Sequence, residues 1–276
     1  MILSFHPRIK GDVNLSLSIN ALFSEHQADL MADADLTVVP QRIKAHQYRF
    51  CRERCKLLFP DYRHRFGFEG KYGNIELFRM FNAPYPRTEA YMSVNAFMER
   101  HTREGIPRLG FPFVVKSDTG GGGWGVFLAR DKKELQEILK KLAEIRRHPT
   151  QRFIAQVFVP HGGRDLRVVV IGKSFYTYWR CQPDPQEFRN NVGRGAFIEH
   201  DLDSDLIYKG VSCVRAFCER TGIDLAAFDL LFDRSRPDPE PLLSEINFLF
   251  GRKGVGGSDS FIAHVKEAVD QLAQTL

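Results

Sequence analysis

The sequence predicts a protein of mixed α and β structure, an α/β or α+β fold. Short apolar segments alternate with helical segments over roughly the first 60 residues, which is typical of a small parallel sheet. The second half is rich in paired strands: DLRVVVIG and SFYTYWRC flank a Gly-Lys pair at residues 172–173, the pattern of a β-hairpin. Between these regions, four consecutive glycines at residues 120–123 separate two apolar segments.

The composition is that of a globular protein with enough apolar residues for a sizeable core. Of its 276 residues, 43% are hydrophobic and 26% are charged. The 39 lysines and arginines exceed the 34 acidic residues and give a net charge of +5, but they are spread along the chain, which does not favour nucleic acid as a partner. No apolar segment approaches the roughly 20 residues that span a bilayer, and the start MILSFHPRIKGD is not typical of a signal peptide. We therefore expect a cytoplasmic protein without a membrane partner.

Residues 1–85 are predicted to form a small N-terminal α/β domain. ILSF and LTVVP are the expected strands, and helices are expected over about residues 15–30 and 43–58. Because strands and helices alternate, the strands should pair in parallel.

Two pairs of side chains in this domain are candidate ligand contacts. His6 and Arg8 follow the first strand, at the end where parallel sheets tend to bind ligands, so both could touch a substrate. Cys51 and Cys55 lie one helical turn apart, which leaves a metal site as an alternative. An ordinary helix is the simpler interpretation of the two cysteines.

Residues 86–158 are predicted to form a second subdomain, in which the glycine run joins two strands. Ahead of this subdomain, KYGNIELFRMF at residues 71–81 has apolar residues at helical spacing, so we expect a helix there that ends ahead of Pro84. A helix over about residues 93–104 leads to the strands FPFVVK and WGVFLA. A helix opened by Asp131 and the strand RFIAQVFV follow.

Residues 159–276 are predicted to form a third subdomain around a mainly antiparallel sheet. The hairpin opens it, and a helix over about residues 202–221 precedes the strands AAFDLLF and LLSEINF. A second glycine-rich loop, GRKGVGG, then leads into a final helix that runs to Leu276.

The glycine run predicts a loop that approaches a ligand closely. Glycine loses more backbone freedom on folding than any other residue, so four in a row need an offsetting role. The run leads from strand to strand, which excludes the P-loop and the dinucleotide-binding fingerprint, because both place phosphate at a helix N-terminus directly after the glycines. A flap that lays N–H groups over a phosphate chain remains, with a plain mobile hairpin as the alternative. Lys116, just before the loop, adds a positive charge suited to phosphate oxygens.

Three oxygen-bearing side chains interrupt the last two apolar strands. Asp229 lies on one strand, and alternation places Glu245 and Asn247 on the same face of the next. Two carboxylates and an amide suit Mg²⁺, which completes its shell with substrate phosphates. Separate surface residues are the alternative, but a charge within an apolar strand needs a partner or a metal.

A further polar group lies on the hairpin and just after it: Asp165, Arg167, Arg180, Arg189 and Asn191. Alternation could aim these side chains at one face of the sheet. Arginines beside a phosphate site can stabilise the charge that develops during phosphoryl or acyl transfer. For any single arginine, a salt bridge on a solvated face is the alternative.

The ordered set of these motifs resembles the ATP-grasp superfamily, and within it the RimK-like and glutathione-synthetase-like carboxylate–amine ligases. The shared order is a lysine-led helix, Lys116 with the glycine flap, the IAQVFV strand, RDLR, WRC, FRNN, and then Asp229 and the SEIN strand, from Lys71 to about Gly257. The resemblance implies an ATP-grasp fold with a short N-terminal pre-grasp domain, a lid carrying the flap, and a C-terminal sheet.

The resemblance also implies roles for individual residues. Arg180 and Lys116 are implied as catalytic residues. Val157 stands where a glutamate is usual in the family, so only the backbone of Val157 should hold adenine. The implied metal ligands are Asp229, Glu245 and Asn247. The implied nucleotide contacts are Lys71, Lys116, Gly120, Gly121, Gly122, Gly123, Gln156, Val157, Phe158, Asp165, Arg189 and Asn191.

The activity implied by the resemblance is ATP-dependent ligation with Mg²⁺ or Mn²⁺. A carboxylate would be activated as an acyl-phosphate and joined to an amine, with release of ADP and phosphate. An ATP-grasp kinase acting on a hydroxyl and a non-catalytic nucleotide-binding protein are the alternatives. The oligomeric state stays open, a homodimer included.

The loop after Asn247 departs from the family pattern. FLFGRKGVGG places Phe250 where proline is usual and a basic pair where relatives carry an apolar and an acidic residue. Since this region should face the second substrate, Arg252, Lys253 and Arg194 are candidate contacts for a substrate with extra negative charge. A solvated basic loop is the alternative.

Overall fold

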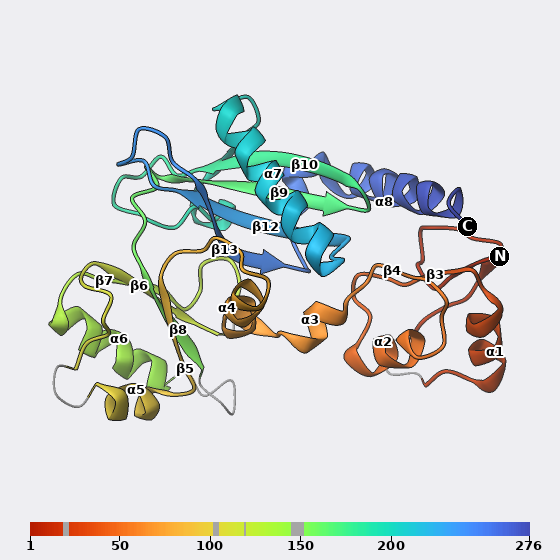
Figure 1. The fold of residues 1–276 in the computed structure, drawn as a ribbon, viewed down its shortest axis with the longest axis horizontal. Helices are drawn as coiled ribbons and strands as arrows, with labels where there is room; N and C mark the ends of the chain where they lie inside the picture. The colour runs from red at the N-terminus through yellow and green to blue at the C-terminus, as the bar shows by residue number, and fades with distance from the viewer. Residues whose placement is uncertain (19–21, 102–104, 119, 145–151) are drawn as a thin grey trace.

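The chain folds around three β-sheets, one for each region expected from the sequence (Figure 1). The computed structural model describes residues 1–18, 22–101, 105–118, 120–144 and 152–276. In Figure 1 the N-terminal sheet lies on the right, the flap-bearing sheet at the lower left, and the C-terminal sheet above it. No helix in the described residues is long and apolar enough to cross a membrane.

The N-terminal sheet is parallel throughout, as the alternation of elements predicted. Its four strands have the order β2-β1-β3-β4, and each neighbouring pair is parallel. Its strands are β1 (Ile2–Ser4), β2 (Val13–Asn14), β3 (Leu36–Val38) and β4 (Leu58–Phe59), and its helices are α1 (Glu25–Asp33) and α2 (Ala45–Arg52).

Both helices of this domain are shorter than expected, so their predicted bounds were wrong. The first begins only at Glu25, because the hydroxyl of Ser24 accepts a hydrogen bond from the backbone of Gln27 and forms a capping box. The second ends at Arg52, and Leu58, expected at its end, lies in β4 beside β3.

Helix α4 (Gly70–Met80) connects the N-terminal domain to the flap-bearing sheet. The short helix α3 (Arg63–Gly67) precedes it. Since α4 also contacts β13, it lies against both the flap-bearing sheet and the C-terminal sheet. In Figure 1 it lies between the two sheets.

The flap-bearing sheet, here called the lid sheet, is antiparallel and has its own apolar core. Its order is β5-β8-β6-β7, and the flap joins β6 to β7 as predicted. Phe97, Leu135 and Phe153 are among the residues of this core. The elements are β5 (Thr88–Tyr91), β6 (Phe113–Ser117), β7 (Val126–Ala129), β8 (Phe153–Val157), α5 (Val94–Arg100) and α6 (Lys132–Glu144).

Part of the expectation for this region was incomplete. Strand β5 was not predicted, and α5 ends at Arg100, short of the expected end at residue 104; residues 102–104 lie outside the described part of the chain. Helix α6 begins as predicted, because the carboxylate of Asp131 accepts the backbone N–H of Glu134 at 2.8 Å.

The C-terminal sheet is antiparallel, with the order β11-β10-β9-β12-β13. Alternation gives it two different faces: Leu166 points towards Gly210 of the long helix α7, while Asp165 and Arg167 point the other way. Strand β11 was not predicted. The elements are β9 (Arg164–Ile171), β10 (Ser174–Cys181), η1 (Val192–Arg194), β11 (Phe197–Glu199), α7 (Ser204–Thr221), β12 (Leu225–Phe232), β13 (Pro241–Asn247), η2 (Lys253–Val255) and α8 (Gly257–Ala273).

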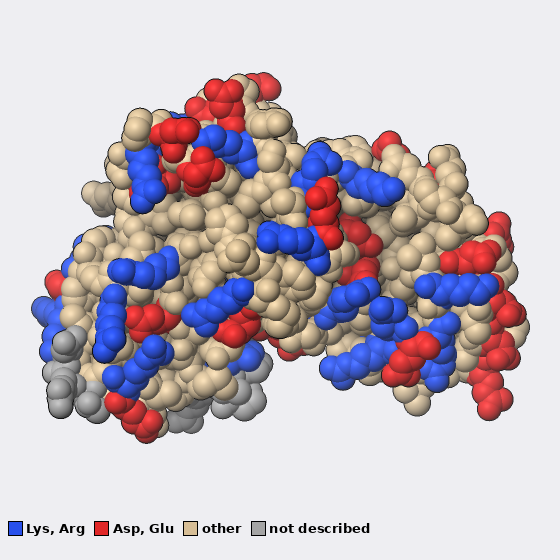
Figure 2. Space-filling model, in the orientation of Figure 1, with Lys and Arg blue, Asp and Glu red and all other residues tan. Residues whose placement is uncertain are grey.

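The surface carries mixed charge. On the face shown in Figure 2, lysines and arginines are interspersed with acidic residues, so that face carries no extended basic stripe. This matches the spread of charge along the sequence.

Candidate active site

A cleft of about 570 Å³ is lined by residues of both the lid sheet and the C-terminal sheet. Residues that are far apart in the sequence meet here, because the flap and β8 come from the lid while β9, β10, β12 and β13 come from the other sheet. The candidate residues that line it are Lys71, Lys116, Gly121, Gly122, Gly123, Gln156, Val157, Phe158, Asp165, Arg180, Arg189, Asn191, Asp229, Glu245, Asn247 and Lys253.

Lys116 lies at the junction of the two sheets. Its ammonium group donates to Oε1 of Gln156 at 2.8 Å, within the lid, and to Oγ of Ser244 at 3.0 Å, on β13. Burial lowers the pKa of Lys116 to about 8, an effect that Glu245 opposes and Lys71 reinforces. Lys116 is therefore a buried cation whose charge depends on the ions around it.

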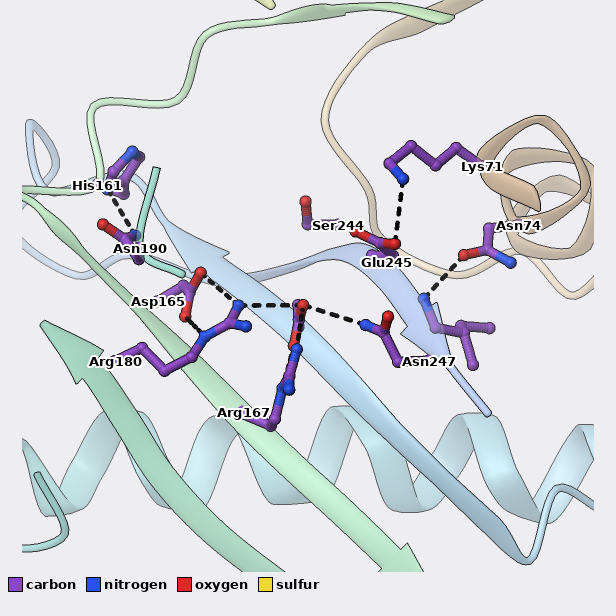
Figure 3. Close-up of polar contacts among 12 residues, drawn as sticks. Lys71, Asn74, His161, Asp165, Arg167, Arg180, Asn190, Ser244, Glu245 and Asn247 are labelled. Atoms are coloured by element: carbon purple, nitrogen blue, oxygen red, sulfur yellow. Dashed lines mark hydrogen bonds and ion pairs between the residues drawn. The ribbon is translucent and has the colours of Figure 1, made fainter. Parts of the chain in front are cut away.

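Helix α4 brings Lys71 to the same place. Its Nζ lies 3.3 Å from Oε1 of Glu245 (Figure 3). The same Nζ donates to the carbonyl of Gly120 at 3.3 Å. Asn74, one turn further along α4, accepts the backbone N–H of Ile246 at 2.8 Å, which fixes the helix to β13. Lys71 therefore bridges the start of the flap and the C-terminal sheet.

The N-terminus of α4 is held on the other side by Asp118. This buried carboxylate accepts the backbone N–H of Tyr72 at 2.7 Å and pairs with Arg152 at 2.8 Å. Since Asp118 follows directly on β6, the strand that carries Lys116 and the helix that carries Lys71 share one anchor.

The flap needs glycine at one position in particular. Gly123 has φ = +79°, and a Cβ built there would lie 2.6 Å from Oδ1 of Asn191 and 2.7 Å from Nε of Arg194. Arg189 and Arg194 each donate to the carbonyl of Gly123 at 3.4 Å. The flap therefore rests on the FRNN segment through its main chain.

A buried group of four charges forms the floor of the cleft (Figure 3). Arg167 holds Asp229 through two hydrogen bonds of 2.6 and 2.8 Å. Arg180 holds Asp165 through two bonds of 2.7 Å and lies 3.0 Å from Oδ2 of Asp229. Burial alone would raise the pKa of Asp229, but the two arginines outweigh it and hold that pKa at about 2.

The expected metal ligands do converge. Asp229 lies opposite Glu245 in the β12–β13 ladder, and Nδ2 of Asn247 donates to Oδ2 of Asp229 at 3.2 Å. Among the described residues, no group of three or more His, Cys, Asp or Glu could hold a metal by itself. Two carboxylates and one amide are ligands that Mg²⁺ accepts together with phosphate oxygens, and Asp229 would join them by exchanging a hydrogen bond from Arg167, Arg180 or Asn247 for the metal.

Several expected residues lie elsewhere. Gly120 is outside the cleft lining and serves Lys71 instead. Arg194 contacts the flap, and its Nε is buried without a hydrogen-bond partner among the described residues. Arg252 does not line the cleft. Its guanidinium lies 4.1 Å above the ring of Phe261, and its side chain lines a second cavity instead.

The sequence did not reveal three residues of the cleft. Ser244 is the extra residue of a β-bulge, because Asp229 pairs with Glu245 and Leu230 pairs with Leu243. His161 and Asn190 lie side by side on the lining, and burial lowers the pKa of His161. The glycine pair after His161 was the only signal in the sequence that a special loop begins there.

A family model described as the RimK-like ATP-grasp domain matches residues 89–255, more than half of the chain. The chain belongs to the RimK-like ATP-grasp family. This confirms the resemblance drawn from the motifs. The match begins within β5, so the N-terminal sheet and Lys71 lie outside it.

Named relatives in this family include ligases. The chain is 27% identical over 161 residues to the "Probable alpha-L-glutamate ligase" of Azotobacter vinelandii, which covers 56% of this chain and 50% of that protein. It is 30% identical over 149 residues to "Beta-citrylglutamate synthase B" of Danio rerio, covering 54% and 34%. The chain thus spans half or less of the length of these relatives.

A solved structure extends the likeness to the whole chain. The RimK domain ATP-grasp protein of Sphaerobacter thermophilus superposes with a TM-score of 0.61 at 14% identity, covering 97% of this chain and 98% of that one. The ATP-grasp fold expected from the motifs is therefore confirmed.

The buried group of four charges on the cleft floor predicts a difference in stability between two arginine variants. Arg167→Leu should lower the free energy of unfolding by about 3–5 kcal/mol, because it leaves two buried carboxylates to share one guanidinium. Arg236→Leu is the control, since Arg236 pairs with Asp233 at the surface and such pairs are worth about 1 kcal/mol or less. Urea unfolding measures both, and equal losses would contradict the structure.

Proposed function

We propose that the protein is an ATP- and Mg²⁺-dependent ligase that activates a carboxylate and joins it to an amine, releasing ADP and phosphate. One observation carries the proposal: Lys71, Lys116 and the flap line a single cleft together with the oxygen donors of β12 and β13. Family membership and the names of the relatives, a ligase and a synthase, support it.

The lid would hold the nucleotide. Lys116 and Lys71 supply positive charge for the phosphate chain, and the flap supplies N–H groups. The backbone N–H of Val157 donates to the carbonyl of Arg87 at 2.9 Å, whereas that of Phe158 makes only a 3.4 Å bond to Pro112. We therefore assign the adenine edge to the main chain of Phe158, with Gln156 holding Lys116 in place.

The C-terminal sheet would hold the reacting groups. Asp229, Glu245 and Asn247 would bind Mg²⁺, which would offset the charge of the phosphate oxygens. The γ-phosphate passes to the substrate carboxylate with loss of ADP, and the amine then displaces phosphate from the acyl-phosphate and loses a proton. Arg180, fixed by Asp165 and Asp229, offers its charge to the transferring group.

We also propose the three-part division at residues 1–85, 86–158 and 159–276. The three sheets support it, because each lies within one of these ranges. The candidate substrate contacts Lys253 and Arg194 belong to the third part; Lys253 is on the cleft lining, and Arg194 is beside the flap.

The deciding experiment is a phosphate-release screen with ATP, Mg²⁺ and pooled carboxylates and amines, followed by mass spectrometry of the products. A ligase releases phosphate only when both substrates are present and forms an amide. A phosphorylated hydroxyl would instead identify a kinase. Asp229→Ala is the control and should abolish turnover; product formation by this variant at the parent's rate would rule out the proposed site.

The depressed pKa of Lys116 predicts how nucleotide affinity varies with pH. In the free protein Lys116 loses its proton near pH 8, and bound phosphate favours the charged form, so binding takes up a proton above that pH. The affinity for MgATP should therefore fall by up to about tenfold per pH unit as pH rises through 8. Calorimetry from pH 7 to 10 measures this.

Lys116→Arg is the matched control for that prediction, because arginine stays charged throughout this range. Its affinity profile should be flat above pH 8. A parent profile as flat as that of the arginine variant would show that Lys116 does not contact the phosphates.

The flap offers a second matched pair. Gly123→Ala should weaken ATP binding by about tenfold or more, because its positive φ and the contact with Asn191 would displace the flap. A Cβ at Gly121 meets nothing within 4 Å, so Gly121→Ala should leave the flap in place. Weaker binding in Gly121→Ala would then report contact with the ligand itself, and unchanged binding in both variants would contradict the role of the flap.

A further inference from the structure

A second cavity, of about 560 Å³, lies at the carboxyl ends of the parallel strands β1 and β3. This is the edge of a parallel sheet where ligands commonly bind, and the volume is that of a small-molecule site. The polar side chains that matter here are His6, Lys10, Gln41, Arg42 and Arg252. The cavity shares none of its lining residues with the nucleotide cleft.

Positive charge dominates the lining of this cavity. No acidic side chain lies among the described residues that line it. The pKa of Arg252 is lowered by burial and by the charges of Arg42 and Arg8. Burial, Arg252 and Arg8 likewise lower the pKa of His6 to about 4, so this imidazole is neutral at physiological pH. The cations therefore repel one another across a partly buried space.

None of the described residues that line the cavity offers these cations a carboxylate. Among the described residues, the side chain of Arg252 donates to Oε1 of Gln41 alone, at 3.3 Å, and stacks on Phe261. Arg8 pairs with Asp259, an exposed residue at the start of α8. An anion in the cavity would relieve the repulsion, and a guanidinium fork suits carboxylate or phosphate oxygens.

Arg252 is held in position before any ligand arrives. Gln41 donates to the carbonyl of Phe248 at 2.9 Å, which fixes the N-terminal domain to the segment after β13. The ring of Phe261 supports the guanidinium from the other side. A fixed cation loses less freedom on binding than a mobile surface side chain.

We propose that this second cavity binds the anionic group, carboxylate or phosphate, of a small molecule, with Arg252 and Arg42 as its main contacts. The site is separate from the nucleotide cleft and does not depend on the proposed ligase activity. Gln41 adds a neutral hydrogen-bonding group to the pocket.

Titration calorimetry with two probes, citrate and inorganic phosphate, at constant ionic strength tests this proposal. The parent should bind at least one probe, and the preferred probe tells carboxylate from phosphate. Arg42→Gln and Arg252→Gln should each weaken binding by about tenfold, the effect of losing one charge-assisted contact. Arg236→Gln, which removes a surface charge that does not line the cavity, is the control and should bind as the parent does.

Two further measurements separate this site from the nucleotide cleft. Lys116→Met should keep the probe binding of the second cavity, while Arg42→Gln should bind MgATP as the parent does. Thermal unfolding checks that each variant is folded, and if Arg252→Gln is not, Arg42→Gln decides. Failure of the parent to bind either probe at millimolar concentration, unchanged binding in Arg42→Gln, or loss of binding only in Lys116→Met would overturn the proposal.

Discussion

The pairing of two arginines with two aspartates under the cleft fixes the geometry of the C-terminal sheet. Asp229 lies opposite Arg167 across β12 and β9, and Arg180 lies opposite Asp165 across β10 and β9. A slip of one residue in any of these strands would turn a charge into the apolar layer under α7, where it would have no partner. The charge pairs therefore specify the strand register, and the register in turn sets Glu245 beside Asp229.

The two sides of the cleft meet through polar contacts, although each side has its own apolar packing. The lid sheet has its own core, although Ile154 of β8 also packs into the main core. In the cleft, Lys116 of the lid donates to Ser244 of β13, and Lys71 of α4 lies beside Glu245. Within the cleft these links are polar, whereas apolar packing there would resist any change in the angle between the sheets. Hydrogen bonds and ion pairs can instead be exchanged for contacts with a charged ligand, so the junction is suited to closing over one. Asn74 keeps α4 on β13 while the lid adjusts.

The sequence predicted those parts of the fold whose pattern is local. The hairpin of β9 and β10 and the strands of β12 and β13 follow from alternation, which also placed Glu245 and Asn247 on one face of β13. The helix expected from residue 15 was wrong at its start, because Ser24 caps the helix there. The prediction followed the apolar spacing and overlooked this cap. Ser244 could not be predicted, because a bulge breaks the two-residue period. Arg252 and Lys253 could not be separated, since their directions depend on the path of a loop.

That loop links the two cavities. Arg252 lines the second cavity, and Lys253 lines the nucleotide cleft. The chain that follows Lys253 has little freedom, because Gly254 packs so closely against the ring of Tyr178 that a Cβ there would overlap the ring. A ligand that shifts the backbone of Arg252 therefore also shifts that of its neighbour Lys253, and linkage requires the reverse effect to be equal in free energy. If both cavities are occupied, the affinities of their ligands are expected to depend on each other through this loop.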